Sequence, residues 1–211
     1  MARLEIEIVS DPVCPWCYIG KRRLEQALAR HPQTRVAIRW SPFQLSPDMP
    51  PEGRDRAEHY AAIFGEDRAR LIQESMVETA QGEGLKFATK PGARSPNTLA
   101  AHVLMSLAEA TPDVDASALA EVLFHAHHAE SEDLGDPAVL LRLAAAVGLD
   151  EEIVQSHLND PQAFEQVLAQ IDQVAARGLN GVPSFVFNGR YAVSGAQPVD
   201  AFADLIARLS V

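Results

Sequence analysis

The sequence predicts an α/β protein in which one small mixed sheet, built from both ends of the chain, is interrupted by an all-helical insertion. Residues 4–9 and 35–40 alternate apolar and polar side chains, which is typical of strands, and a helical stretch separates them. Residues 54–159 have helical periodicity throughout. Residues 184–187 and 191–193 are short apolar runs on either side of Asn188-Gly189, a two-residue hairpin turn.

In the N-terminal part, the strand at residues 4–9 leads through residues 10–20 into a helix that includes residues 21–30. The second strand, at residues 35–40, ends in a segment with four prolines between residues 41 and 51. Proline cannot donate to a strand ladder, so this segment is expected to leave the sheet and mark a domain boundary.

The insertion is expected to begin with helices at residues 54–64 and 66–81, separated at Gly65, followed by a loop at residues 90–96. Further helices are expected to open near Asn97, to include residues 119–126, to run from Pro137 to Gly148, and to start at Asp150. An amphipathic helix ending at Gly178 then leads to the hairpin and to a last helix with an apolar stripe over residues 199–209. The predicted domains are therefore residues 1–48 with 162–211, and the helical insertion at 49–161.

The composition of the chain argues against several classes of function. The chain has 211 residues and a net charge of −11, which argues against nucleic acid or an anionic membrane as its partner. It contains no apolar run long enough to cross a membrane and no apolar signal segment after Met1. With two cysteines in total, these features predict a cytoplasmic protein.

The two cysteines, Cys14 and Cys17, lie where the first strand leads into the first helix. The first helical turn has amide groups without intrahelical partners and the positive end of the helix dipole, so it stabilises a thiolate. Pro15 suits that turn because its missing N–H would have no partner there. We therefore assign Cys14 as the exposed nucleophile and Cys17, one turn on, as the buried resolving thiol. Pro15 and Trp16 between them are expected to tune the redox poise and to contact substrate.

Other interpretations of these residues are weaker. A structural zinc site needs four ligands, and the chain has no second cysteine pair. A static disulfide across so short a loop would constrain the unfolded chain little. His125, His127 and His128 form a local cluster, but no carboxylate stands nearby at metal-ligand spacing, so we expect a solvated or partly packed helix and no metal site.

Three stretches together resemble a known family: Ser10–Gly20 with its C-P-W-C motif, Ser95–His102, and Gly181–Phe185 with Val193–Gln197. The order of elements resembles the thioredoxin fold, and the helical insertion resembles the DsbA group within it. The motifs resemble the FrnE-like branch, which is related to 2-hydroxychromene-2-carboxylate isomerase and kappa-class glutathione transferase. The resemblance implies a redox pair at Cys14 and Cys17, a cis-proline at Pro183 facing them, and substrate hydrogen bonds to the Val182 backbone.

The sequence departs from the related groups at two places. Periplasmic DsbA proteins have an acidic residue on the first strand six positions before the first cysteine, where this chain has Ile8; Glu5 and Glu7 fall on the other face of that strand. The isomerase and transferase branch has serine in place of Cys14 and an acidic residue in the late loop that holds glutathione. This chain has Ser194–Gln197 there, which weakens a glutathione-dependent interpretation.

The leading functional prediction is a thiol–disulfide oxidoreductase that acts on protein or small-molecule thiols and disulfides through Cys14 and Cys17. It is expected to need no cofactor, with glutathione as a candidate co-substrate, and to bind neither nucleic acid nor membrane. Two alternatives stay open: a glutathione-dependent isomerase or transferase acting on an aromatic small molecule, and a binding module whose cysteines only respond to redox state. Trp16 and Tyr18 either form a substrate rim or pack under the insertion.

Overall fold

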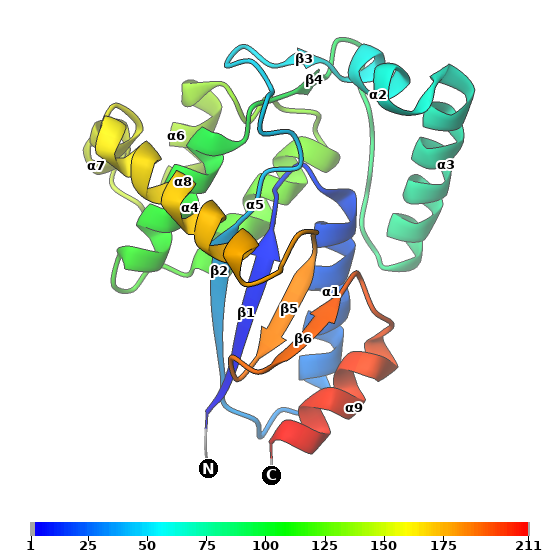
Figure 1. The fold of residues 1–211 in the computed structure, drawn as a ribbon, viewed down its shortest axis with the longest axis vertical. Helices are drawn as coiled ribbons and strands as arrows, with labels where there is room; N and C mark the ends of the chain where they lie inside the picture. Colours follow the sequence, from blue (N-terminus) through cyan, green and yellow to red (C-terminus); the bar gives the residue numbers. More distant parts are fainter. Residues whose placement is uncertain (1–2, 211) are drawn as a thin grey trace.

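A computed structural model describes residues 3–210 of the protein (Figure 1). The strands within these residues are β1 (Leu4–Ser10), β2 (Val36–Pro42), β3 (Arg54–Asp55), β4 (Arg94–Ser95), β5 (Ser184–Phe187) and β6 (Tyr191–Ser194). The helices are α1 (Pro15–Ala29), α2 (Arg56–Phe64), α3 (Glu66–Gly82), α4 (Leu99–Ala110), α5 (Ala116–His128), α6 (Pro137–Ala145), α7 (Glu151–Leu158), α8 (Pro161–Ala176) and α9 (Val199–Leu209). No helix in this range combines the length and apolarity needed to cross a bilayer.

The main sheet joins the two ends of the chain, as the sequence predicts. Its strand order is β2-β1-β5-β6. β1 pairs parallel with β2, antiparallel pairs join β1 to β5 and β5 to β6, and Ile8 stands opposite both Trp40 and Phe185. This arrangement makes a mixed α/β sheet in which β1, the strand that leads to the cysteines, is central (Figure 1).

One face of this sheet is covered by α1 and α9, which contact each other (Figure 1). Alternate residues of β1 and β5 supply its apolar side chains, and the two helices supply the rest. The buried members of this core are Leu4, Ile6, Ile8, Leu24, Ala27, Phe185, Phe187, Phe202, Ala203 and Ile206. Ile8 therefore belongs to the hydrophobic core, at the position where periplasmic DsbA proteins have an acidic residue.

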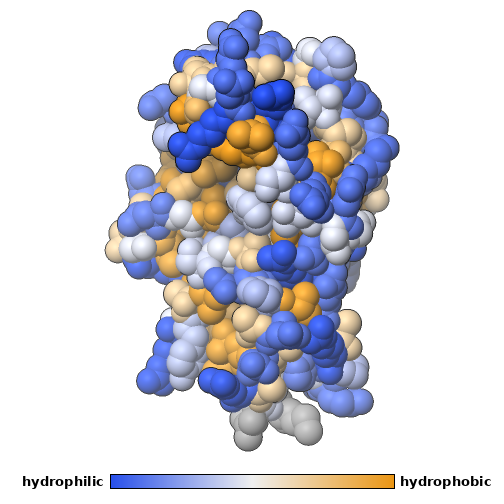
Figure 2. Space-filling view, turned by 90° about the vertical axis from the view of Figure 1, so that its right-hand side faces the viewer, coloured by the Kyte–Doolittle hydropathy of each residue, from blue (hydrophilic) through white to orange (hydrophobic). Residues whose placement is uncertain are grey.

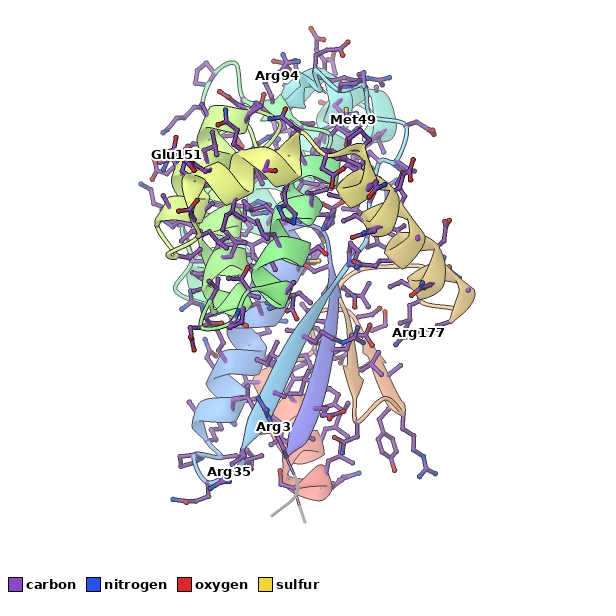
Figure 3. The ribbon with its side chains drawn as sticks, turned by 90° about the vertical axis from the view of Figure 1, so that its left-hand side faces the viewer. Arg3, Arg35, Met49, Arg94, Glu151 and Arg177 are labelled. Carbon is purple, nitrogen blue, oxygen red and sulfur yellow. The ribbon has the colours of Figure 1, made fainter. Side chains whose placement is uncertain are left out.

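The opposite face of β1 carries a buried carboxylate, Glu7, which is 7% exposed. Arg177, just after α8, donates two hydrogen bonds to it at 2.8 and 2.6 Å, and the Ser41 hydroxyl donates a third at 2.6 Å. Burial raises the pKa of Glu7, but these bonds outweigh burial and leave that pKa below its usual value. Figure 3 shows Arg177 at the end of α8, beside the sheet. Glu7 therefore ties α8 to β1 and is a structural group.

The helical insertion forms a second core, in which α4 contacts α5, α6 and α7. Helix α4 also contacts α8, in a separate small cluster of Val103, Ala163 and Val167. The N-terminal end of α1 belongs to the second core as well, because Cys14, Cys17, Tyr18 and Ile19 are buried in this core. The N-terminal end of α1, which carries the cysteines, thus lies where the sheet meets the insertion (Figure 1). The domain limits proposed from the sequence stay a prediction.

Two short segments differ from the sequence prediction. Arg54 and Asp55, expected to start a helix, form β3, and Arg94 and Ser95, expected in a loop, form β4. The two strands pair antiparallel with each other, and the Arg56 N–H donates to the Ala93 carbonyl at 2.9 Å. Strands of two residues have no periodicity of their own, so their pairing comes from contacts between segments far apart in the sequence.

Gly20 in α1 is required by close packing against β5. A Cβ atom at this position would lie 3.0 Å from Cζ of Phe185 and 3.2 Å from Cγ of Pro183. We expect Gly20→Ala to lower the free energy of unfolding by about 1–3 kcal/mol, as overpacking does. Gly82→Ala is the matched control, because a Cβ there meets nothing within 4 Å and alanine favours a helix. Urea denaturation of both variants checks this; equal stabilities would contradict it.

Candidate active site

Cys14 caps the N-terminus of α1, with Pro15 as the first helical residue. Its own N–H donates to the Asp11 carbonyl at 2.9 Å, and its carbonyl accepts the Cys17 N–H at 3.0 Å. No acidic residue stands in the first turn, so the free amide groups there are left to stabilise negative charge on a nearby sulfur. The location of both cysteines at the helix start is as predicted.

Both sulfurs are free thiols, and both side chains are buried: Cys14 is 4% exposed and Cys17 is 1% exposed. The prediction that Cys14 is an exposed residue is therefore wrong. The insertion covers it, and helix position alone could not reveal that cover. Cys14 instead lines a cavity of about 730 Å³, whereas Cys17 is not among the residues that line it. Of the two thiols, only Cys14 is therefore accessible through this cavity.

Burial raises the pKa of the Cys17 thiol well above its usual value, and the hydrogen bond and charge of Cys14 raise it further. Cys17 is therefore held as a neutral thiol while Cys14 remains reduced. A thiol of this kind becomes a nucleophile only when the environment around it changes, for example when Cys14 is bound to another sulfur. A resolving cysteine needs this property, because it has to stay unreactive until its partner cysteine is bound to another sulfur.

The segment before β5 lies next to Cys14. The Cys14 thiol is 4.0 Å from the Val182 carbonyl oxygen, within the range of a weak thiol hydrogen bond. The Val182–Pro183 peptide bond is cis. Pro183 is buried, and its ring lies against α1 at Gly20. The Val182 backbone and Cys14 therefore border the same cavity.

The two aromatic residues near the thiols have different environments. Trp16 is 38% exposed and lines the cavity beside Cys14. Tyr18 is buried and stacks on Phe124 with ring centroids 5.1 Å apart, and its hydroxyl donates to Glu121 at 2.7 Å. Trp16 is thus available to a substrate in the cavity, while Tyr18 is a packing residue.

Asp11 is a candidate functional residue that the sequence analysis gave no role. It is fully buried, lines the cavity with Cys14, and accepts the backbone N–H of Leu45 at 2.8 Å and of Val13 at 3.3 Å. Nε2 of His102 lies 3.9 Å from Oδ1 of Asp11, but burial lowers the pKa of that imidazole to about 4, so it is neutral at pH 7. Burial without a cationic partner raises the pKa of Asp11 to about 7. A carboxyl group that titrates near neutral pH is suited to proton exchange.

Asp11→Asn gives a test of this shifted pKa. From about pH 4 to about pH 7 the folded protein keeps a proton on Asp11 that the unfolded chain, with the usual pKa of 3.8, has lost. The free energy of unfolding of the natural protein should therefore fall relative to Asp11→Asn by ~1.4 kcal/mol per pH unit across this window, and level off above it. Urea denaturation of both proteins from pH 4.5 to 8.5 checks this. The buried histidines are common to both proteins and cancel; parallel curves would show that Asp11 is not shifted.

The histidine cluster is packed differently from the prediction. His125 is exposed, but His127 and His128 are only 4% and 8% exposed, so the expected solvated or partly packed helix is wrong for these two. His127 Nδ1 lies 3.1 Å from Arg56 Nη2, and since a guanidinium can only donate, Nδ1 is the acceptor. His128 stacks on Phe87. Within residues 3–210, no group of three or more His, Cys, Asp or Glu is arranged to hold a metal ion.

Asn97 and Thr98, expected as a helix start, connect α4 to the site. Helix α4 begins at Leu99, close to the predicted start near Asn97, and the Leu99 N–H donates to the Asn97 side-chain oxygen at 3.0 Å. The Asn97 amide in turn donates to the Met49 carbonyl at 2.7 Å. Thr98 is buried and lines the cavity together with Asp11. The start of α4 therefore fixes part of the cavity floor.

Comparisons with known proteins agree with this geometry. Residues 5–207 match the family model described as the DSBA-like thioredoxin domain. A probable DsbA oxidoreductase from Streptomyces coelicolor superimposes with a TM-score of 0.88 at 31% identity, covering 98% of this chain and 89% of that one. The cytosolic disulfide reductase DsbM from Pseudomonas aeruginosa has the same fold, with a TM-score of 0.70 at 20% identity over 97% of this chain and 98% of that one.

A relative in Bacillus subtilis (strain 168), the uncharacterized protein YwbO, is 26% identical over 207 residues, which is 97% of this chain and 96% of that protein. These matches extend over nearly the whole chain, including both parts of the sheet and the helical insertion. With a two-cysteine motif capping α1 and Val182–Pro183 beside it, the chain belongs to the DSBA-like thioredoxin family, a family of oxidoreductases.

Proposed function

We propose that this protein is a thiol–disulfide oxidoreductase in which Cys14 exchanges disulfides with a substrate and Cys17 resolves the resulting adduct. The observation that carries the proposal is the unequal placement of the two thiols. Cys14 lines the cavity at the end of α1, and Cys17 lies behind it, where burial keeps it protonated. Only the first sulfur can meet a substrate, and only the second can displace it from within the protein.

In the reducing direction the Cys14 thiolate attacks one sulfur of a substrate disulfide. The substrate S–S bond breaks, a mixed disulfide forms at Cys14, and the first substrate thiolate leaves and takes a proton. Cys17 then loses its proton and attacks Cys14, so that the second substrate thiol leaves and the Cys14–Cys17 disulfide forms. The substrate gains two electrons and the cysteine pair loses two. The oxidising direction is the reverse of these steps.

The surrounding residues have separate roles in this proposal. Asp11, which lines the same cavity, accepts or supplies the proton that Cys17 exchanges. The Val182 backbone orients the substrate sulfur near Cys14, and Pro15 and Trp16 contact the rest of the substrate. Pro183 is a positioning residue, because it holds Val182 through its packing on α1 at Gly20.

The proposed reaction needs no resident cofactor, and a second thiol compound returns the pair to its starting state. Glutathione, the candidate co-substrate expected from the sequence, and an uncharged thiol are the two options for that role. The alternative of a glutathione-dependent isomerase or transferase is less favoured, because it leaves Cys17 without a task. The cytoplasmic location predicted from the sequence remains part of the proposal.

The direct test is catalysis of disulfide reduction by the purified protein with dithiothreitol as the electron donor. Two substrates cover the two size classes: insulin, followed by precipitation of its B chain, and 2-hydroxyethyl disulfide. We expect the protein to accelerate reduction of at least one of them in proportion to its concentration. Acceleration of neither, with Cys14 shown to react with iodoacetamide, would contradict the proposed function.

A further inference from the structure

The cavity at Cys14 is large and has one wall made of apolar side chains. Helices α2 and α3 form this wall, and three of its side chains are unusually exposed for their type: Ile63 is 55%, Phe64 39% and Leu71 59% exposed. Leu45 and Trp16 add apolar surface on the other side. Figure 2, which faces the α3 side of the molecule, shows hydrophobic side chains in its upper half, some set back in a hollow. Large apolar side chains gathered around a hollow indicate a binding site.

The same cavity has no cationic side chain among the described residues that line it. Among the residues that line it in the described part of the chain there is no lysine or arginine, and the titratable side chains are Asp11, His59, Tyr60, His127 and Cys14. Burial lowers the pKa of both histidines, and a nearby Arg54 lowers that of His59 further, so both are neutral at pH 7. Buried Arg56 contacts His127 from behind the wall, with its donors directed at that imidazole and at backbone carbonyls.

We propose that this cavity binds an uncharged, apolar small-molecule thiol or disulfide, carrying aromatic or branched aliphatic groups, and discriminates against anionic thiols such as glutathione. The volume of about 730 Å³ lies within the range typical of small-molecule sites. Glutathione would bring two carboxylates into a cavity that offers no cation and contains Asp11. A polypeptide segment would place backbone N–H and C=O groups against the apolar wall of α2 and α3. This inference rests on the proposed function, since it names the substrate class of the same sulfur.

A matched pair of substrates separates the effect of substrate charge on the reaction from the effect of substrate shape. Dibenzyl disulfide with para-carbamoyl groups and dibenzyl disulfide with para-carboxylate groups have the same length and similar leaving thiols, and differ in charge. We expect kcat/KM at pH 7 to be higher for the carbamoyl compound by about tenfold or more, because the carboxylates of the other compound would lose hydration in a cavity with no lysine or arginine in its lining. Equal values for the two compounds, or a preference for the carboxylate, would overturn the proposal.

Two lysine substitutions test whether the α2–α3 wall causes the preference. Ile63→Lys puts a cation into the cavity wall and should reduce the preference for the carbamoyl compound by about tenfold. Ile153→Lys is the control, because Ile153 on α7 is similarly exposed, at 50%, and does not line the cavity. It makes the same change in net charge and should leave the preference within twofold. An equal effect of both substitutions would show that the preference comes from overall charge.

Binding of an inert analogue separates this inference from the proposed function. The para-carbamoyl dibenzyl sulfide has one sulfur in place of the disulfide, cannot react with Cys14, and can be titrated by calorimetry. We expect it to bind the natural protein and Ile153→Lys, and to bind Ile63→Lys about tenfold more weakly. This result would stand even if no disulfide were turned over, in which case only the oxidoreductase proposal fails. If the sulfide does not bind while reduced, alkylated insulin chains do, the occupant is a polypeptide and the inference is wrong.

Discussion

Cys14→Ser is expected to lower the rate of disulfide reduction by about 10³-fold or more, to the level of the reaction without protein. Cys14 is the sulfur that lines the cavity, and a serine hydroxyl at pH 7 is neither ionised nor able to form a disulfide. Cys17 cannot replace it, because its side chain is 1% exposed and burial holds its thiol protonated. The rate with insulin and with 2-hydroxyethyl disulfide measures the effect.

Controls must show that Cys14→Ser loses its activity because the thiol is missing and not because the protein is unfolded. Serine is close in size to cysteine, so the urea midpoint of Cys14→Ser should stay near that of the natural protein. Ser75→Ala provides a second control, since Ser75 also lines the cavity but lies on α3, away from the helix that holds the cysteines. That variant should retain most of the turnover. Turnover above one-tenth of the natural rate in Cys14→Ser would contradict the assignment of Cys14 as the nucleophile.

Cys17→Ser is expected to stop turnover after one step and to accumulate a mixed disulfide on nearly every molecule. In this variant Cys14 still caps α1 and can attack, but no sulfur within the protein can displace the bound substrate thiol. Exposure to 2-hydroxyethyl disulfide, followed by acid quenching and mass spectrometry, should show one adduct per chain. The natural protein should show only a small fraction of adduct, because Cys17 resolves it.

The same exposure of Cys14→Ser is the control for this experiment and should yield no adduct, since Cys17 is outside the cavity. Peptide mapping should place the adduct of Cys17→Ser on Cys14. If Cys17→Ser forms no adduct although its Cys14 reacts with iodoacetamide, the protein is better described as a binding module whose cysteines respond to redox state.

Much of the fold could be predicted because it is encoded locally. Strands β1 and β2 alternate residue by residue, and Gly65 separates two helices with a φ of 79°. The hairpin at Asn-Gly was also predicted, but its loop has three residues, 188–190, where two were expected, because Phe187 pairs with Tyr191. The β3–β4 pair was missed because its strands have two residues each and the paired residues are 39 and 41 positions apart in the chain. A pairing that depends on two distant segments leaves no periodic signal in either one.

The active site was likewise predictable from the sequence only in part. The positions of Cys14, Cys17 and Pro15 follow from the order strand, motif, helix, and Val182 and Pro183 came from a family resemblance. Asp11 was within the motif, but its burial is created by contacts with residues from other segments, such as Leu45 and Thr98. The burial of Cys14 and the apolar wall of the cavity likewise depend on how the insertion packs over α1. Sequence patterns describe single elements, and these properties belong to several elements together.

If Cys14 and Cys17 form one reversible redox pair, a count of free thiols in glutathione redox buffers of defined composition will show it. The protein is equilibrated at graded ratios of glutathione to glutathione disulfide, quenched with acid, labelled at its free thiols, and weighed by mass spectrometry. We expect both thiols to disappear together, with a two-electron dependence, into a single Cys14–Cys17 disulfide. Loss of the Cys14 thiol alone, as a stable glutathione adduct with Cys17 still free at every ratio, would contradict it.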